Sequence, residues 1–144
     1  MGCLVFKAEG PKQGFGLFSS KRTYDKTVYL DAVTVIGRDA TPGFIYPDRK
    51  LPLELAGVTN QIGIPDKHIS RRHAIIWPYI DPLTNQPSGE YVLMDLGGSG
   101  GTALLRGTKR ISLIANKATL LRENDVILIP GHPNCIPTEF TFVY

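Results

Sequence analysis

The sequence predicts an all-β fold, namely a β-sandwich of about eleven strands in two antiparallel or mixed sheets. Short runs of β-branched and aromatic residues recur from one end of the chain to the other. The 15 glycines and 11 prolines lie mostly between these runs, where turns are expected. No long segment shows the apolar periodicity of a helix, so the pattern favours strands throughout.

In the first half of the chain, four runs are predicted to be strands because Val, Ile, Leu, Phe, Tyr and Thr dominate them. They cover residues 4–7, 27–30, 33–36 and 61–64. The third run, Val-Thr-Val-Ile, is almost continuously apolar and ends at Gly37, as expected of a buried strand. The other three have Gly, Asp, Asn or Pro close by, and these residues favour turns.

The second half contains seven further runs of the same kind, separated by glycines and asparagines. They cover residues 74–79, 91–95, 102–105, 110–114, 117–120, 126–129 and 139–143. The first of them, Ala-Ile-Ile-Trp-Pro-Tyr, is long and apolar, which indicates a strand inside the sandwich.

The domain organisation follows from chain length and from the spacing of these runs. A chain of 144 residues can bury a core without disulfides, so residues 1–144 are predicted to form a single domain. Two connections, near residues 10–26 and 39–60, are long for a compact sandwich, and a shorter one covers residues 81–89. Loops longer than about 15 residues are usually functional, so the two long ones are candidate specificity elements.

The composition is that of a soluble globular protein, with 42% hydrophobic and 20% charged residues. No apolar run approaches the roughly 20 residues of a membrane helix. Phe6 stands where an N-myristoylation signal has Ser or Thr, so no membrane partner is expected.

The two cysteines form no disulfide framework and no secretory signal pattern opens the chain. We therefore expect an intracellular protein, nuclear or cytoplasmic.

The positive charge is concentrated in the first half of the sequence. Eleven of the 16 Lys and Arg residues lie in residues 1–72 against 7 of the 13 acidic residues, although the net charge is only +3. This asymmetry suits an anionic partner. The positive charge is too sparse to indicate a nucleic-acid partner, because binding to nucleic acid normally requires a denser basic stripe.

A candidate anion site surrounds the start of predicted strand 74–79. Ser70 and Arg71 lie just before this strand, and Arg38 directly follows the strand 33–36 and Gly37. A glycine-rich turn at residues 97–101 connects two further strands. Guanidinium groups match phosphate oxygens and a serine hydroxyl adds a short donor, so strand ends that bring them together can hold a phosphoryl group.

These motifs, in this order, resemble the forkhead-associated (FHA) domain family. They are Gly37-Arg38, then Ser70-Arg71-Arg72-His73, then the Asp95-Leu96-Gly97 turn that ends in Gly101-Thr102, and finally the turn and strand at residues 121–127. The resemblance runs from about residue 4 to residue 143. It implies an eleven-stranded β-sandwich whose loops at one end bind peptides carrying phosphothreonine, with no cofactor and no catalysis.

The resemblance also implies roles for individual residues. Arg38 would lie against the phosphopeptide, Ser70 would donate to the phosphate, and Arg71 would add charge. Ser99 takes the place of a phosphate-contacting threonine, and Gly100 takes the place of an asparagine that holds the peptide backbone. The residues expected to support the site are Gly37, His73, Gly101 and Thr102, with His73 bracing the loop by hydrogen bonding.

Gly100 is the main departure from the family pattern. Losing one neutral hydrogen bond removes about 0.5–1.5 kcal/mol, so we expect binding to be weakened several-fold up to roughly tenfold. Consecutive glycine amides can offset part of this loss by forming an anion-binding concavity. The substitution Gly100→Asn is expected to tighten binding unless this position has a left-handed backbone.

Other functions fit the sequence less well. The main alternative is a phosphate-independent protein-interaction module on the same fold. A hydrolase using Ser70 and His73 lacks a Gly-x-Ser-x-Gly elbow, and the glycine turn lacks the lysine of a P-loop. The candidate metal ligands His68, His73, His132 and Cys135 lack a Cys-x2-Cys knuckle. We therefore expect no enzyme activity and no metal.

Overall fold

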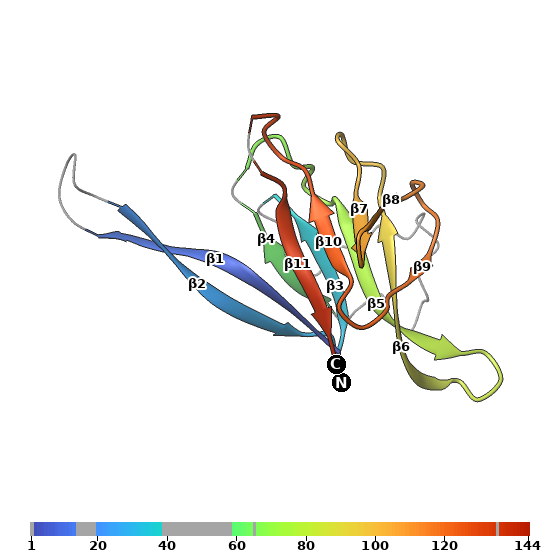
Figure 1. Cartoon of the computed structure of the whole chain (residues 1–144). Coiled ribbons are helices and arrows are strands. Elements are labelled where there is room, and N and C mark those ends of the chain that lie inside the picture. The colour runs from blue at the N-terminus through green and yellow to red at the C-terminus, as the bar shows by residue number, and fades with distance from the viewer. Residues whose placement is uncertain (1, 14–19, 39–58, 65, 135) are drawn as a thin grey trace.

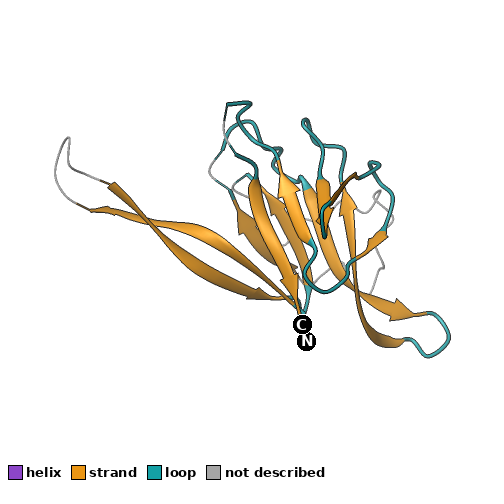
Figure 2. Cartoon of the chain, viewed as in Figure 1, coloured by secondary structure: helices purple, strands orange, loops and turns teal. Residues whose placement is uncertain are grey.

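The structure is a computed structural model that describes residues 2–13, 20–38, 59–64, 66–134 and 136–144. These residues form eleven β-strands and no helix (Figures 1 and 2). The strands are β1 (Cys3–Gln13), β2 (Ser20–Tyr29), β3 (Val33–Gly37), β4 (Thr59–Gly63), β5 (Ala74–Asp81), β6 (Gln86–Asp95), β7 (Ala103–Arg106), β8 (Lys109–Ser112), β9 (Thr119–Leu120), β10 (Val126–Ile129) and β11 (Thr138–Val143). Within this part of the chain, no helix long and apolar enough to cross a membrane is found.

The strands form two sheets, which confirms the predicted all-β sandwich. One sheet has six strands in the order β2-β1-β11-β10-β7-β8, and all its neighbours are antiparallel. The other has five strands in the order β4-β3-β5-β6-β9. In this second sheet β3 and β4 run parallel, so it is mixed.

The main core lies between the sheets, and its members come from both of them. It includes Leu4, Leu104, Ile127, Phe140 and Phe142 of the six-stranded sheet and Ile36, Ile76 and Leu93 of the five-stranded sheet. A second cluster is formed by Val33, Val35, Ile75, Trp77, Val92, Met94 and Leu96. Successive residues of β5 alternate between the two clusters, so this strand is buried on both faces. That burial explains its continuous apolar sequence.

The predicted long loop near residues 10–26 is largely wrong. Strand β1 pairs with β2 from Cys3 opposite Tyr29 to Gln13 opposite Ser20, and the two form a hairpin that projects from the sandwich (Figure 1). Residues 14–19 lie outside the described residues. The Gly10-Pro11 pair, which indicates a turn by composition, lies where the register of this ladder shifts. A proline, which lacks an N–H donor, is tolerated at such an irregularity.

Of the two other predicted loops, one is mostly outside the described residues and one is replaced largely by strands. Residues 39–58 lie outside the described residues, and residues 59 and 60 already belong to β4. The predicted connection 81–89 is reduced to a short turn, because β5 continues to Asp81 and β6 begins at Gln86. Residues 86–90 are exposed on both faces, so the strand shows no alternation of apolar and polar residues there.

The candidate site lies at one end of the sandwich. The end of β3 and the connections β4–β5, β6–β7 and β10–β11 all lie at the upper end in Figure 1, and both termini lie at the lower end. Predicted site residues far apart in the sequence are therefore brought to the same end by the strand order.

Candidate functional site

The end of β3 packs directly against the loop that carries Ser70. The backbone N–H of Arg38 donates to the carbonyl oxygen of Ser70 at 3.0 Å, and the N–H of Ile64 donates to the carbonyl oxygen of Gly37 at 2.9 Å. A Cβ atom at Gly37 would overlap the carbonyl oxygen of Arg71. Only glycine fits this close approach of two backbone segments.

The side chain of Arg38 is held by the same loop. Its Nη1 atom donates to the carbonyl oxygen of Lys67 at 3.0 Å. This bond fixes the direction of the side chain, and the guanidinium retains further N–H donors in a rigid planar group. Arg38 is partly buried, whereas the neighbouring Arg71 is exposed.

Ser70 is joined to the glycine turn by a hydrogen bond. The backbone N–H of Ser99 donates to Oγ of Ser70 at 3.2 Å. Since Oγ accepts this bond, the hydroxyl can still donate its own proton to a ligand. A Cβ atom at Gly98 would lie 2.7 Å from Oγ of Ser70 and 3.0 Å from Nδ1 of His73. The absence of a side chain at Gly98 lets the turn approach the serine.

His73 lies beneath this turn and is fully buried. Its backbone N–H donates to Ile36 and its carbonyl accepts from Leu96, which places it between β3 and the end of β6. Its Nε2 atom is hydrogen-bonded to the carbonyl oxygen of Gly101. A carbonyl only accepts, so Nε2 carries a proton and donates it. The buried Nδ1 atom has no hydrogen-bond partner among the described residues.

The glycine turn is held by hydrogen bonds to Asp95, which precedes it. Thr102 donates to Oδ1 of the buried Asp95 at 2.7 Å, and the N–H of Gly97 donates to Oδ2 at 3.2 Å. Gly97, Gly100 and Gly101 have φ angles of 81°, 87° and 72°, which glycine adopts without strain. These conformations fold the turn back, and Ser99 and Gly100 are exposed at its tip.

A fourth segment, the β10–β11 connection, borders the turn and the Ser70 loop. A Cβ atom at Gly100 would lie 3.4 Å from the side chain of Pro130. Asp66 accepts from the backbone N–H groups of His68 at 2.8 Å and His132 at 3.1 Å, and it also contacts Nδ1 of His68 at 3.3 Å. The two backbone bonds hold the pKa of the Asp66 carboxyl below its ordinary value. This carboxylate links two loops at the end of the sandwich.

The identity of the fold follows from comparison with known families. Residues 34–130, from β3 to the end of β10, match the FHA domain. This span is more than half of the chain. The chain belongs to the FHA domain family. FHA domains are interaction modules and not enzymes.

Solved structures extend the likeness to the strands outside the family match. Full-length yeast Pml1p superposes with a TM-score of 0.54 and 18% identity, over 99% of this chain and 81% of that chain. The MEK1 FHA domain superposes with a TM-score of 0.52 and 16% identity, over 98% of this chain and 88% of that chain. An engineered FHA with a Myc-pTBD peptide has a TM-score of 0.51 and 16% identity, over 98% of this chain and 89% of that chain. These similarities show a common fold. Comparison with curated protein sequences gives no match.

In this FHA domain, hydrogen bonds join Arg38, Ser70 and Ser99 at a single place, with Arg71 next to Ser70 in the chain. Gly100 lies in the same turn but faces Pro130. The sequence reasoning missed three sets of contacts: Gly98 against Ser70, the carbonyl of Lys67, and the bonds of Asp66. Gly98 was visible only as one glycine among several, and carbonyl acceptors carry no sequence signal.

The residues considered for other chemistry have structural surroundings in this FHA domain. His73 donates to Gly101 and Ser70 accepts from Ser99, so neither contact forms a serine-histidine pair. The rings of His68 and His132 meet edge to face at 4.7 Å. Cys135 lies outside the described residues, and the remainder contains no group of three His, Cys, Asp or Glu residues suited to a metal ion.

Proposed function

We propose that this FHA domain binds phosphothreonine in intracellular partner proteins and acts as an adaptor without chemistry of its own. The observation that carries the proposal is the junction at Ser70. Its carbonyl accepts from Arg38 and its hydroxyl oxygen accepts from Ser99, so three separate loops meet at one residue.

The junction offers the donors that a phosphate requires. A phosphothreonine carries about −1.5 to −2 charges and three acceptor oxygens. Arg38 and Arg71 supply positive charge, and the hydroxyls of Ser70 and Ser99 supply neutral donors. An unphosphorylated threonine would leave these donors without an anion, so discrimination between the two forms is expected.

The glycine turn compensates in part for the missing asparagine. Positive φ angles at Gly97, Gly100 and Gly101 fold the turn. The N–H groups of Gly97, Ser99 and Gly101 donate within the protein, whereas no such bond is found for the N–H of Gly100 among the described residues. Backbone N–H groups at such turns favour anions. We propose that Gly100 contributes to ligand binding through its backbone. The resulting affinity is expected to be several-fold weaker than with the asparagine side chain.

The experiment is a direct comparison of phosphorylated and unphosphorylated peptides. An oriented phosphothreonine peptide library, read against the same library without phosphate, should give binding only to the phosphorylated set. Arg38→Ala should lower the affinity by about 1.5 kcal/mol or more, because it removes a charged donor. Arg110→Ala, an exposed arginine on β8, serves as the matched control.

Two outcomes would contradict the proposal. Equal binding of both libraries would favour the phosphate-independent interaction module. Equal losses in Arg38→Ala and Arg110→Ala would show attraction to general positive charge. Titration with duplex DNA at two salt concentrations tests for nucleic-acid binding, since counterion release gives the affinity for DNA a steep salt dependence.

A further inference from the structure

Strands β1 and β11 separate before either strand ends. Their ladder consists of Cys3 opposite Val143, Leu4 opposite Phe142 and Val5 opposite Thr141. Beyond Val5, β1 pairs only with β2 among the described strands. Figure 1 shows the β1–β2 hairpin leaving the sandwich while β11 stays beside β10. The two strands therefore form a fork, defined here by Phe6 and Lys7 on one side and Thr138 and Glu139 on the other.

The direction of the backbone groups shows that both sides of the fork have an open edge. On β1, the carbonyl of Gly2 accepts from Leu30 after β2, so even-numbered residues direct their peptide groups toward β2. Lys7, an odd-numbered residue, directs its N–H and C=O away from β2. The ladder bonds on this side end at Val5.

The same alternation applies to β11. The N–H of Phe142 donates to Asp125, and its carbonyl accepts from Asn124, on the side of β10. Glu139 is three residues away, so its N–H and C=O point to the opposite side, toward β1. Lys7 and Glu139 would form the next rung of the β1–β11 ladder, and this rung is not formed.

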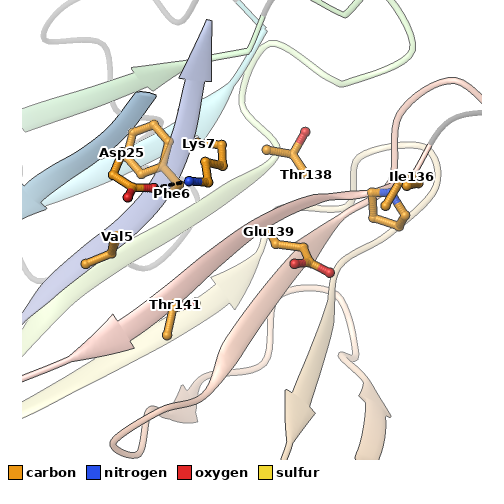
Figure 3. A pocket seen from close by; sticks show the side chains of 9 residues that line it. Val5, Phe6, Lys7, Asp25, Ile136, Thr138, Glu139 and Thr141 are labelled. Carbon is orange, nitrogen blue, oxygen red and sulfur yellow. Dashed lines mark ion pairs between the residues drawn. The ribbon is translucent and has the colours of Figure 1, made fainter. Parts of the chain in front are cut away.

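The fork contains a pocket with an apolar floor (Figure 3). Its volume is about 660 Å³, and its lining includes Val5 and Phe6 of β1 and Thr141 of β11. The ring of Phe6 packs on that of Phe140 at 4.9 Å, which closes the inner side. Ile136 borders the pocket and is 85% exposed. Among the described residues, exposed apolar surface therefore lies directly beside two unpaired strand edges.

The charges around the pocket are unequal. Lys7 pairs with Asp25 at 2.6 Å, and the two charges offset each other. Glu139 also lines the pocket and is exposed. The lining thus has one excess negative charge, which a lysine or arginine of a partner would complement.

We propose that the fork binds an extended peptide segment of a partner protein. The segment adds its backbone to the open edges at Lys7 and Glu139, as in other β-strand additions. Alternate apolar side chains of the segment contact Phe6 and Ile136, and a basic side chain faces Glu139. This binding needs no phosphate and uses none of the residues assigned to the phosphothreonine site.

The test uses short unphosphorylated random peptides displayed on phage and selected on the full chain. Selected peptides should carry alternating apolar residues and a Lys or Arg. Bound to the isotope-labelled protein, they should shift the amide resonances of Lys7 and Glu139. A peptide N-methylated at alternate backbone nitrogens keeps its side chains but loses donors, and it should bind at least about fivefold more weakly.

Proline variants locate the edge on the protein. Lys7→Pro and Glu139→Pro each remove an N–H that points into the fork and leave the bonds to β2 and β10 in place. Each should weaken binding by about two- to tenfold. The matched control is Arg110→Pro on β8, whose N–H points away from β7 because Leu113 donates to Thr102 at the inward positions.

Three results would overturn this assignment: no selected peptide, shifts confined to residues outside the fork, or equal affinity for the N-methylated peptide. The last comparison uses the unaltered protein, so it remains decisive if a proline variant fails to fold. Phosphopeptide binding should be unchanged in Lys7→Pro, which keeps failure of this inference separate from failure of the phosphothreonine site.

Discussion

The backbone N–H of Ser99 donates to Oγ of Ser70 at 3.2 Å and thereby joins two loops that are 29 residues apart in the sequence. The bond orients the serine hydroxyl, because Oγ is held as an acceptor and its own proton remains for a ligand. The serine thus has a fixed position before any peptide binds.

Ser70→Ala removes both functions of this hydroxyl. We expect a loss of about 1.5–3 kcal/mol in phosphopeptide binding, the range for hydrogen bonds to charged groups. Isothermal titration calorimetry measures the change. The control is Ser88→Ala near the start of β6, which removes a serine that donates to the carbonyl of Tyr79 and should leave the affinity unchanged. An unaltered Kd in Ser70→Ala would remove this residue from the proposed site.

Gly37→Ala should displace the loop that carries Ser70 and Arg71. The added methyl group would overlap the carbonyl of Arg71, so the Ser70 loop must move. We expect a loss of about 2–3 kcal/mol in unfolding free energy and a clear loss of phosphopeptide affinity. Gly107→Ala is the control, because its φ is 63° and nothing lies within 4 Å. That variant should lower stability by about 1–2 kcal/mol and keep the affinity. Retained binding in Gly37→Ala would argue that the loop position is unimportant.

Gly100→Asn tests the departure from the family pattern. The sequence alone predicts tighter binding, but the φ of 87° adds strain for any side chain. Asn85, Asn116 and Asn124 have φ angles of 56–68°, closer to the left-handed region that asparagine tolerates. We therefore expect Gly100→Asn to lower the unfolding free energy by about 1 kcal/mol, measured by urea denaturation. Comparison with Gly100→Ala isolates any gain in binding from the amide side chain.

The bonds of Asp66 predict a pH dependence of stability. Its pKa is lowered in the folded protein, so its stabilising effect is fully present above the ordinary pKa of 3.8. This contribution is lost as the pH falls through the lower folded value. Wild type and Asp66→Asn should therefore differ in unfolding free energy near neutral pH and converge in acid. A constant difference across the titration would show that the carboxylate charge is irrelevant.

The pair of Arg106 and Asp125 should matter more than an exposed ion pair. Nε and Nη2 of Arg106 donate to the two carboxylate oxygens at 3.0 and 2.8 Å, and Asp125 is only 1% exposed. Arg106→Ala leaves a buried carboxylate with fewer donors and should cost about 2–4 kcal/mol. Lys7→Ala breaks an exposed pair with Asp25 and should cost under about 1 kcal/mol. Chemical denaturation of both variants measures the contrast, and equal losses would contradict it.

The sequence predicted a run within each of the eleven described strands and missed the outer parts of two hairpins. Apolar runs marked β3 and β5 because both lie in the core. The outer parts of the β1–β2 and β5–β6 hairpins are paired in backbone ladders, and backbone bonds leave no pattern of side chains. Composition therefore indicated loops in both places.

The sequence also predicted only part of the candidate site, namely the residues that stand in motifs at strand ends. Arg38 and Ser70 stand in motifs at strand ends, and the strand order brings those ends together. The bond of Asp66 to the backbone of His132 spans 66 residues and depends on the path of the β10–β11 connection. No local pattern encodes such a contact, because its donor is a peptide group that every non-proline residue possesses.

The bonds that join the loops at this end each have a peptide group on at least one side, namely the bonds of Arg38 to Ser70, Ser99 to Ser70 and His73 to Gly101. Exposed side chains such as Arg71 and Ser99 contribute little to holding the loops in place. Such residues can be exchanged during evolution without refolding the scaffold. Under the proposed function, the exposed residues that face a partner can therefore change while the bonds between the loops are kept.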